Sequence, residues 1–395
     1  MKTNSENICN ELGAKFFCKD YVYENLYYYD IDKNKKELCD GLFDYAGTYI
    51  VLQIKERSKT QKGTKTNEQW LQDIVYGDKD SAKTQIIKTI ETLKNNDLIV
   101  NDLYHQKVQL HKDYLVYPVI VFDNDDINTY NKTIDVGDYI INVFNLKDFK
   151  IMMEVLGHPY DIFYYLKTRC EYLNETSHFP MLFIGDGETT TTMSHIDTEQ
   201  DFAYAIFNTI YDGKAENQNY ALTMMKIIKD FREKEIKHNI NYKKILEILQ
   251  LIEPRYAKKF VEDILYGLNQ ATSDKFDATK GIKLIPKNYI NNTICKPINI
   301  IFVSTGLNIP KEINKYCHIL SDAKQLKYNE DCVILLILIS GNQKEFYINW
   351  AYYENTKFVY DEKLYEFWNY AGMYNGSITK NEFEKYCDKF PYQNI

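Results

Sequence analysis

The chain has 395 residues, enough for two or three domains, and its 45% hydrophobic and 15% aromatic content is typical of a globular protein. The formal net charge of −8 argues against a strong non-specific nucleic-acid binder, although a divalent cation and a local basic segment can still supply a positive field. The eight cysteines form no CxxC pair, which argues against a zinc site and against disulfides. This pattern predicts that the protein is located in the reducing cytoplasm. The polar N-terminus predicts no signal peptide, and no apolar run approaches the ~20 residues that span a bilayer.

The first predicted elements are a helix and a two-stranded hairpin. The helix covers residues 7–17, where apolar side chains recur at helical spacing. The hairpin turn is expected over residues 45–48, because Gly47 can adopt the positive φ that a tight turn requires. A turn centred between residues 46 and 47 pairs Phe43 with Ile50 and sets the register of both strands.

This register gathers polar side chains on one face of the hairpin. Asp40 faces Gln53, and Lys55 lies one pair further along the same face. Phe43 and Ile50 belong to the opposite, apolar face, which is predicted to be part of the hydrophobic core. Asp40 and Gln53 carry oxygen atoms of the kind that Mg²⁺ prefers, and a neighbouring lysine can hold a water molecule or a phosphate. The alternative is a hairpin whose outer face is polar and solvated.

A basic segment leaves the strand that carries Lys55. It contains Arg57, Lys59, Lys62 and Lys65 among Ser, Thr, Gly and Gln, so it is predicted to be a loop. A basic loop at this position is well placed to meet a phosphate backbone, which makes these four residues the predicted nucleic-acid-binding set. An ordinary solvated loop is the alternative.

Two more elements complete the N-terminal part of the chain. Asp80 or Ser81 is expected to cap a helix that runs to about Leu93 with an apolar stripe on one side. Residues 114–122 read as a buried strand, although Pro118 favours an edge position or a bulge. The order helix, strands, helix, strand is that of an α/β sandwich.

Residues 5–125 resemble the PD-(D/E)xK superfamily of restriction-like nucleases. Asp40 matches the metal-binding aspartate of that family and Lys55 its catalytic lysine, while Gln53 stands where the family usually has Asp or Glu. The resemblance implies an α/β/α core, a Mg²⁺ or Mn²⁺ ion held by Asp40 and Gln53, and DNA as the substrate, with RNA not excluded. The neutral amide of Gln53 adds no negative charge to the site, so the site is expected to hold one metal ion well rather than two.

The run from Glu37 to Asp40 is similar to a form found in nuclease-like proteins of bacterial defence islands. Those proteins often carry a glutamate on the first helix, and Glu11 is the matching candidate; some branches carry a glutamine on the later helix, which Gln85 matches. Glu37 could add the missing negative charge only if a bulge brought it to the side of Asp40, because strand alternation places the two on opposite sides.

The remaining chain is predicted to form two more regions, so the expected domains are a nuclease-like domain over 1–130, a mostly helical region over 131–280 and a C-terminal α/β domain over 281–395. A helix is expected to start near Asn145 or Asp148 and to be broken at His158-Pro159, and Gly267 is expected to stop another helix. Helices are expected over 160–172, 221–236, 242–251, 254–265, 362–370 and 379–390, and strands over 138–144, 298–303, 332–339 and 345–352.

The residues and the resemblance together predict a cytoplasmic, Mg²⁺-dependent endonuclease that acts on DNA, with catalytic residues Asp40, Gln53 and Lys55. The resemblance alone implies Glu11 as a further catalytic residue and a role in defence against foreign DNA. The alternative is a catalytically weak or inactive protein that keeps the nuclease fold and binds nucleic acid or a partner. A protein partner or a homo-oligomer is compatible with both, and no membrane is expected.

Overall fold

In this computed structural model the described residues are 3–17, 19–45, 47–57, 64–94, 100–101, 107–108, 110, 114–124, 126–173, 182–185, 191–194, 196, 198–211, 213–236, 239–273, 277–278, 281–284, 287–288, 293–294, 297–306, 319–320, 322–323, 326, 333–342, 344–354, 362–370 and 379–388. The chain divides into two compact units, 1–222 and 223–395, with the division inside helix α8 (Ala215–Glu235). Each unit combines helices with a mixed sheet, so the protein is of the α/β type.

The first unit is built on one sheet with the strand order β5-β4-β1-β2-β3-β6-β8-β7. The neighbouring strands β3, β6 and β8 are parallel to one another, and all other neighbouring pairs are antiparallel. The strands are β1 (Val22–Tyr29), β2 (Lys35–Tyr45), β3 (Thr48–Glu56), β4 (Val100–Asn101), β5 (Lys107–Val108), β6 (Leu115–Asp123), β7 (Thr133–Asp135) and β8 (Ile140–Asn145).

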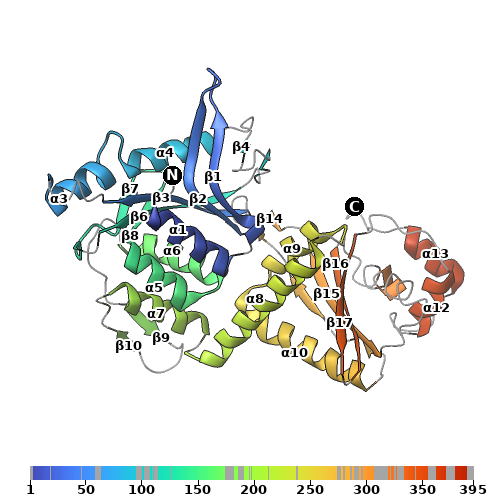
Figure 1. Ribbon diagram of the computed structural model, residues 1–395. Helices are drawn as coiled ribbons and strands as arrows, with labels where there is room; N and C mark the ends of the chain where they lie inside the picture. Colours follow the sequence, from blue (N-terminus) through green and yellow to red (C-terminus); the bar gives the residue numbers. More distant parts are fainter. Residues whose placement is uncertain are drawn as a thin grey trace. The chain divides into compact units, whose positions relative to one another are not determined.

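Helices cover both faces of this sheet (Figure 1). One core contains Phe43 and Ile50 and packs under α1, α5, α6 and α7; the other contains Leu42 and Val51 and packs under α3, a π-helical turn at Leu71–Tyr76 and α4. The helices are α1 (Asn4–Phe16), α3 (Asn67–Trp70), α4 (Ala82–Leu93), α5 (Leu146–Leu156), α6 (Pro159–Leu173) and α7 (Glu199–Tyr211). The face of the hairpin that carries Leu42 and Val51 is therefore partly core, and the alternative of a polar, solvated outer face does not hold.

The predicted register of the hairpin is confirmed. Phe43 pairs with Ile50, Gly41 pairs with Leu52, and Gly47 has a positive φ of 82° at the turn. The first helix starts at Asn4 instead of residue 7, because Thr3 caps it through a capping box with Glu6.

The prediction for Pro118 was wrong about its strand. It lies in β6, which is inside the sheet between β3 and β8 rather than at an edge. The ladder with β8 begins one residue later, at Val119, so Pro118 has a strand neighbour on one side only. Proline has no backbone N–H to donate, and at Pro118 the pairing of β6 with β8 has not yet begun. The proline therefore does not interrupt the hydrogen bonds between β6 and β8.

Several predicted element ends in this unit are confirmed. Ser81 caps α4, and its hydroxyl accepts a hydrogen bond from Thr84 N at 3.2 Å. Asn145, one of the two expected starts, caps α5, and α6 begins at Pro159, one residue before the expected start at 160. Helix α5 ends at Gly157, which has a φ of 67° in the left-handed region. A short hairpin of β9 (Leu182–Gly185) and β10 (Thr191–Ser194) precedes α7.

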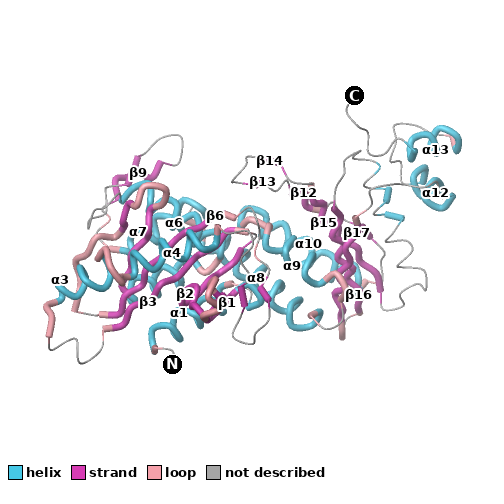
Figure 2. Tube along the Cα trace, turned by 90° about the horizontal axis from the view of Figure 1, so that it is seen from above, coloured by secondary structure: helices cyan, strands magenta, loops and turns pink. Residues whose placement is uncertain are grey.

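The second unit has a smaller sheet with the order β11-β15-β16-β17, and β12 also pairs with β15. Every residue of the parallel strands β15 (Ile298–Gly306) and β16 (Val333–Gly341) is buried. Helices α12 (Glu362–Tyr370) and α13 (Lys380–Asp388) lie together in both views (Figure 2). The other elements are α9 (Tyr242–Gln250), α10 (Pro254–Thr272), β11 (Asp277–Ala278), β12 (Ile282–Leu284), β13 (Lys287–Asn288), β14 (Thr293–Ile294) and β17 (Phe346–Tyr353).

Gly267 does not stop a helix, contrary to the sequence prediction. Helix α10 continues through it to Thr272, and a Cβ at Gly267 would lie 2.5 Å from Cδ1 of Ile339 on β16. The glycine lets the helix lie close to the sheet, which is a packing role that sequence position does not reveal.

The two-unit division differs from the predicted boundaries at 130 and 280. Strands on both sides of residue 130, β6 and β8, pair within one sheet. No helix in the described part of the chain is long and apolar enough to cross a bilayer.

Candidate active site

A pocket of about 450 Å³ lies in the first unit, between the β1–β2 hairpin, the end of β3 and helix α4. Three carboxyl groups, three lysines and two glutamines contribute to its wall. The lining residues are Glu6, Tyr28, Lys36, Glu37, Leu38, Cys39, Asp40, Gln53, Ile54, Lys55, Gln85, Lys88, Thr89 and Thr92. It therefore brings together three of the four predicted catalytic residues, Asp40, Gln53 and Lys55.

Asp40 and Gln53 are in direct contact across the two strands. Nε2 of Gln53 and the backbone N–H of Ile54 each donate to the same carboxylate oxygen of Asp40, both at 2.6 Å. Gln53 is only 7% exposed, so its amide is held in place by the sheet. The pairing deduced from the turn thus places these two side chains as expected.

The carboxyl group of Asp40 holds a proton more strongly than an ordinary aspartate. Burial raises its pKa to about 7, against the opposing effects of the Ile54 N–H and the Lys55 ammonium, while Glu37 and Glu6 add to the rise. The positive groups of the protein near Asp40 therefore do not fully stabilise its negative charge. A cation bound beside the carboxylate would stabilise the ionised form.

Lys55 is held by the predicted glutamine of α4. Its Nζ donates to Oε1 of Gln85 at 2.6 Å. Helix α4 is in turn attached to β2, because the hydroxyl of Thr89 donates to the backbone carbonyl of Leu38. The lysine therefore has a defined direction within the pocket, set by a helix that the sheet positions.

Glu37 lines the same pocket as Asp40 because strand alternation is interrupted between them. Leu26 pairs with Cys39 but Tyr27 pairs with Glu37, so the register of β1 against β2 shifts by one residue. Leu38 and Cys39, although adjacent, both belong to one buried cluster. This is the bulge on which the sequence interpretation of Glu37 depended.

The first helix contributes Glu6 to the pocket, and Glu11 is not among the lining residues. Ser5 anchors this end of the helix, since its hydroxyl contacts Oδ2 of Asp123 at 2.6 Å and Oε2 of Glu56 at 2.9 Å. Sequence reasoning missed Glu6 because the predicted helix began one residue after it; the T-x-x-E capping pattern at Thr3 was the available signal.

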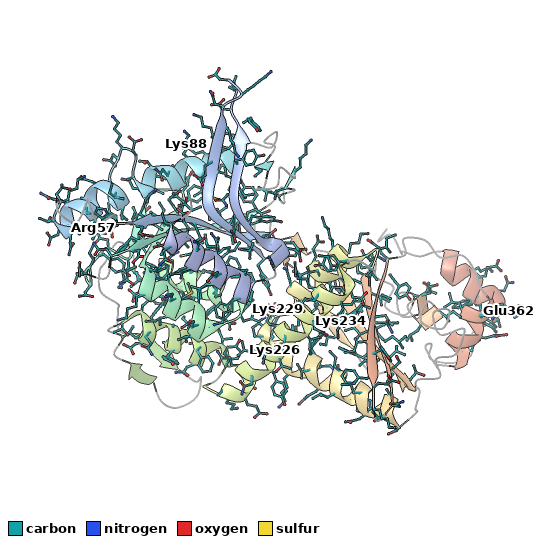
Figure 3. All side chains as sticks on the ribbon, in the orientation of Figure 1. Arg57, Lys88, Lys226, Lys229, Lys234 and Glu362 are labelled. Atoms are coloured by element: carbon teal, nitrogen blue, oxygen red, sulfur yellow. The ribbon has the colours of Figure 1, made fainter. Side chains whose placement is uncertain are left out.

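The basic segment is described only in part, because Lys59 and Lys62 lie outside the described residues. Arg57 is 7% exposed, and its guanidinium donates to the Asn67 side chain and to the backbone carbonyl of Lys65. Arg57 holds the start of α3 against the end of β3 (Figure 3). The prediction that Arg57 is exposed and available to a phosphate backbone is therefore wrong. Lys65 forms an exposed ion pair with Asp73 at 2.8 Å.

No three His, Cys, Asp or Glu side chains gather closely enough to hold a metal by themselves in the part of the chain that is described. A cation near Asp40 would need the side-chain oxygen of Gln53 and oxygens from water or substrate. Mg²⁺ commonly accepts such a set, with one or two protein ligands.

Comparisons with protein-family models, with curated proteins and with solved structures found no match to this chain. Its fold and its pocket are therefore described from its own residues.

Proposed function

We propose that this protein is a divalent-metal-dependent nuclease that hydrolyses phosphodiester bonds in DNA. The observation that carries the proposal is the contact of Asp40 with Gln53 beside a lysine that Gln85 orients, in one recessed pocket. A carboxylate and an amide oxygen can hold one metal ion, and an oriented ammonium can stabilise the charge that develops on a phosphate during hydrolysis.

The donor atoms fit a single hard cation. Asp40 supplies a carboxylate, and a half-turn of the Gln53 amide about its last torsion replaces the nitrogen with its oxygen at the same contact. Mg²⁺ or Mn²⁺ held by Asp40 and Gln53 would polarise the scissile phosphate and lower the pKa of the attacking water. Glu37 and Glu6 add negative charge nearby that favours a cation.

Lys55 is the group that meets the reacting phosphate in this proposal. Its ammonium, fixed by the hydrogen bond to Gln85, lies on the same side of the hairpin as Asp40 and acts on that carboxyl electrostatically. It can therefore hold the attacking water or stabilise charge that develops on the phosphoryl oxygens. Gln85 is a positioning residue, because it acts through Lys55.

A second candidate has one specific observation in its favour. The Gln53 amide donates to Asp40, which satisfies that carboxylate without a metal. A protein that keeps this contact would bind nucleic acid or a partner with little cleavage. A role in defence against foreign DNA, and any protein partner, remain predictions from the resemblance.

The test is cleavage of supercoiled plasmid in Mg²⁺ or Mn²⁺ by the full-length protein, beside Asp40→Asn, Glu6→Gln and Glu11→Gln. We expect Asp40→Asn to abolish cleavage, Glu6→Gln to weaken it and Glu11→Gln to leave it intact. Cleavage that persists in Asp40→Asn would refute the proposed site. Absence of cleavage together with absence of metal binding, measured by calorimetry on the same samples, would favour the second candidate.

A further inference from the structure

We propose that the pocket takes an unpaired polynucleotide strand, with a base stacked on Tyr28 and phosphates held by Lys36 and Lys88 on either side of Asp40. This inference rests on the proposed function, because it assumes that the pocket binds nucleic acid. It adds the form of the substrate and the residues that recognise it.

Tyr28 and Lys36 form one wall of the pocket. They face each other across the β1–β2 ladder, so both side chains lie on the same side of the hairpin. The neighbouring rings of Tyr27 and Tyr29 pack edge to face at 5.7 Å, whereas no described ring packs against Tyr28. Tyr28 is half-buried: it packs in part against the hydrophobic cluster that contains Leu42 and Val51, and it also lines the polar pocket, where a base could stack on the part of the ring that the cluster leaves uncovered.

Lys88 forms the opposite wall. It lies on α4, next to the β1–β2 hairpin (Figure 3), three residues after Gln85 and therefore on the same side of the helix as the glutamine that holds Lys55. The side chain of Lys36 is 49% exposed, and its only ion pair among the described residues, with Asp30, is long at 3.8 Å. Both lysines can turn to a phosphate at little cost.

The charges of the pocket indicate that strand and cation bind together. Three lysine ammonium groups oppose three carboxyl groups, so the wall has no net charge when all are ionised. They are Lys36, Lys55 and Lys88, and Glu6, Glu37 and Asp40. A polyanion gains little from such a pocket until a divalent cation adds two positive charges.

The position of Tyr28 is what favours an unpaired strand. In a duplex the bases are stacked along the axis, so a ring in the wall of a recessed pocket can stack only on a base that has left the stack. The volume of about 450 Å³ lies within the range of small-ligand sites, roughly 300–1,000 Å³, and suits a short stretch of chain.

The experiment measures fluorescence anisotropy of a labelled DNA strand, the same strand in a blunt duplex and the matching RNA strand. The protein is titrated in Ca²⁺, used in place of Mg²⁺ so that cleavage and binding can be measured separately, and in EDTA. We expect a single strand to bind at least about tenfold more tightly than the duplex, a difference of ~1.4 kcal/mol, and binding to be lost in EDTA. The two single-strand arms show which sugar is accepted.

Matched variants test the named contacts. Tyr28→Leu is expected to weaken single-strand binding by about 5- to 150-fold, the equivalent of the ~1–3 kcal/mol of one base–aromatic stack, while Tyr28→Phe retains it. Tyr29→Leu is the control on the same strand. Lys88→Glu should weaken binding, and Lys79→Glu, outside the pocket, should not. Melting curves of each variant exclude unfolding.

The outcomes separate this inference from the proposed function. Equal or tighter binding of the duplex, or equal effects of Tyr28→Leu and Tyr29→Leu, would overturn the unpaired-strand inference even if plasmid cleavage still depends on Asp40. Absence of both binding and cleavage in every metal would overturn the inference and the proposed function together.

Discussion

Replacing Glu199 by glutamine is expected to destabilise the first unit by about 3–5 kcal/mol, because it leaves a buried guanidinium without its counter-ion. Arg169 and Glu199 are both 0% exposed, and Nε of Arg169 donates to Oε1 of Glu199 at 2.7 Å. Nζ of Lys132 also contacts Glu199 at 3.3 Å. The cluster links α6 and α7 to β8, where Arg169 donates to the carbonyl of Val143 at 2.8 Å.

The magnitude follows from what remains after the substitution. Arg169 keeps its bonds to the Val143 carbonyl and to Oδ1 of Asn142 at 3.1 Å, so its donors stay partly satisfied while its charge does not. For a domain of this size each kcal/mol lowers the melting temperature by ~2–4 °C, which predicts a fall of about 6–20 °C.

The effect should depend on pH in a defined direction. Burial alone would raise the pKa of Glu199, but Arg169 and Lys132 outweigh it and hold that pKa below its ordinary value. The stabilisation is therefore complete above the unfolded pKa of about 4.3 and is lost as pH falls through the lower folded value. The difference between wild type and Glu199→Gln should be full at pH 7 and shrink below about pH 4.

Calorimetric melting with hydrogen exchange of α6 peptides measures this in the full chain and assigns the transition to the first unit. The control is Glu171→Gln, which removes an exposed i,i+4 pair with Lys167 on the same helix and should leave the melting temperature almost unchanged. Similar small shifts for both variants would refute the reasoning that the buried pair holds these layers together.

Three further results are expected. Ser81→Ala removes the cap of α4 and should cost about 1 kcal/mol in denaturant unfolding, with Ser81→Gly costing less. Gly13→Ala places a Cβ 2.4 Å from the ring of Phe43 and should cost about 1–3 kcal/mol, much of which Phe43→Leu should restore in a double-mutant cycle; additive effects would contradict this. Gln53→Glu sets a second carboxylate against Asp40, so its melting temperature should fall in EDTA and recover in Mn²⁺ more than that of wild type; an unchanged metal response would count against the site.

The hairpin could be predicted because its turn and its strand register depend only on residues close in sequence. A glycine that accepts a positive φ placed the turn, and alternation then placed Asp40 beside Gln53. The same holds for the caps at Ser81 and Asn145, where a short polar side chain precedes an apolar stripe. These features depend on neighbours in sequence, so they can be read without the fold.

What could not be predicted depends on contacts between distant segments. The bulge that brings Glu37 to the pocket arises in the pairing of β1 with β2, and the burial of Arg57 arises from α3 folding back over β3. Gly267 looks like a helix stop in sequence but serves the packing of α10 against β16. Such cases show tertiary packing overriding local preference.

The most direct test of the central claim is the rate of plasmid cleavage in Mg²⁺ by wild type, Lys55→Met and Lys65→Met. Lys65 belongs to the same basic segment but pairs with Asp73 outside the pocket, so it controls for lost positive charge. We expect Lys55→Met to lower the rate by at least about a hundredfold, the size of a lost transition-state contact, and Lys65→Met to stay near wild type. Equal rates for the two variants would contradict an active site built on Asp40, Gln53 and Lys55.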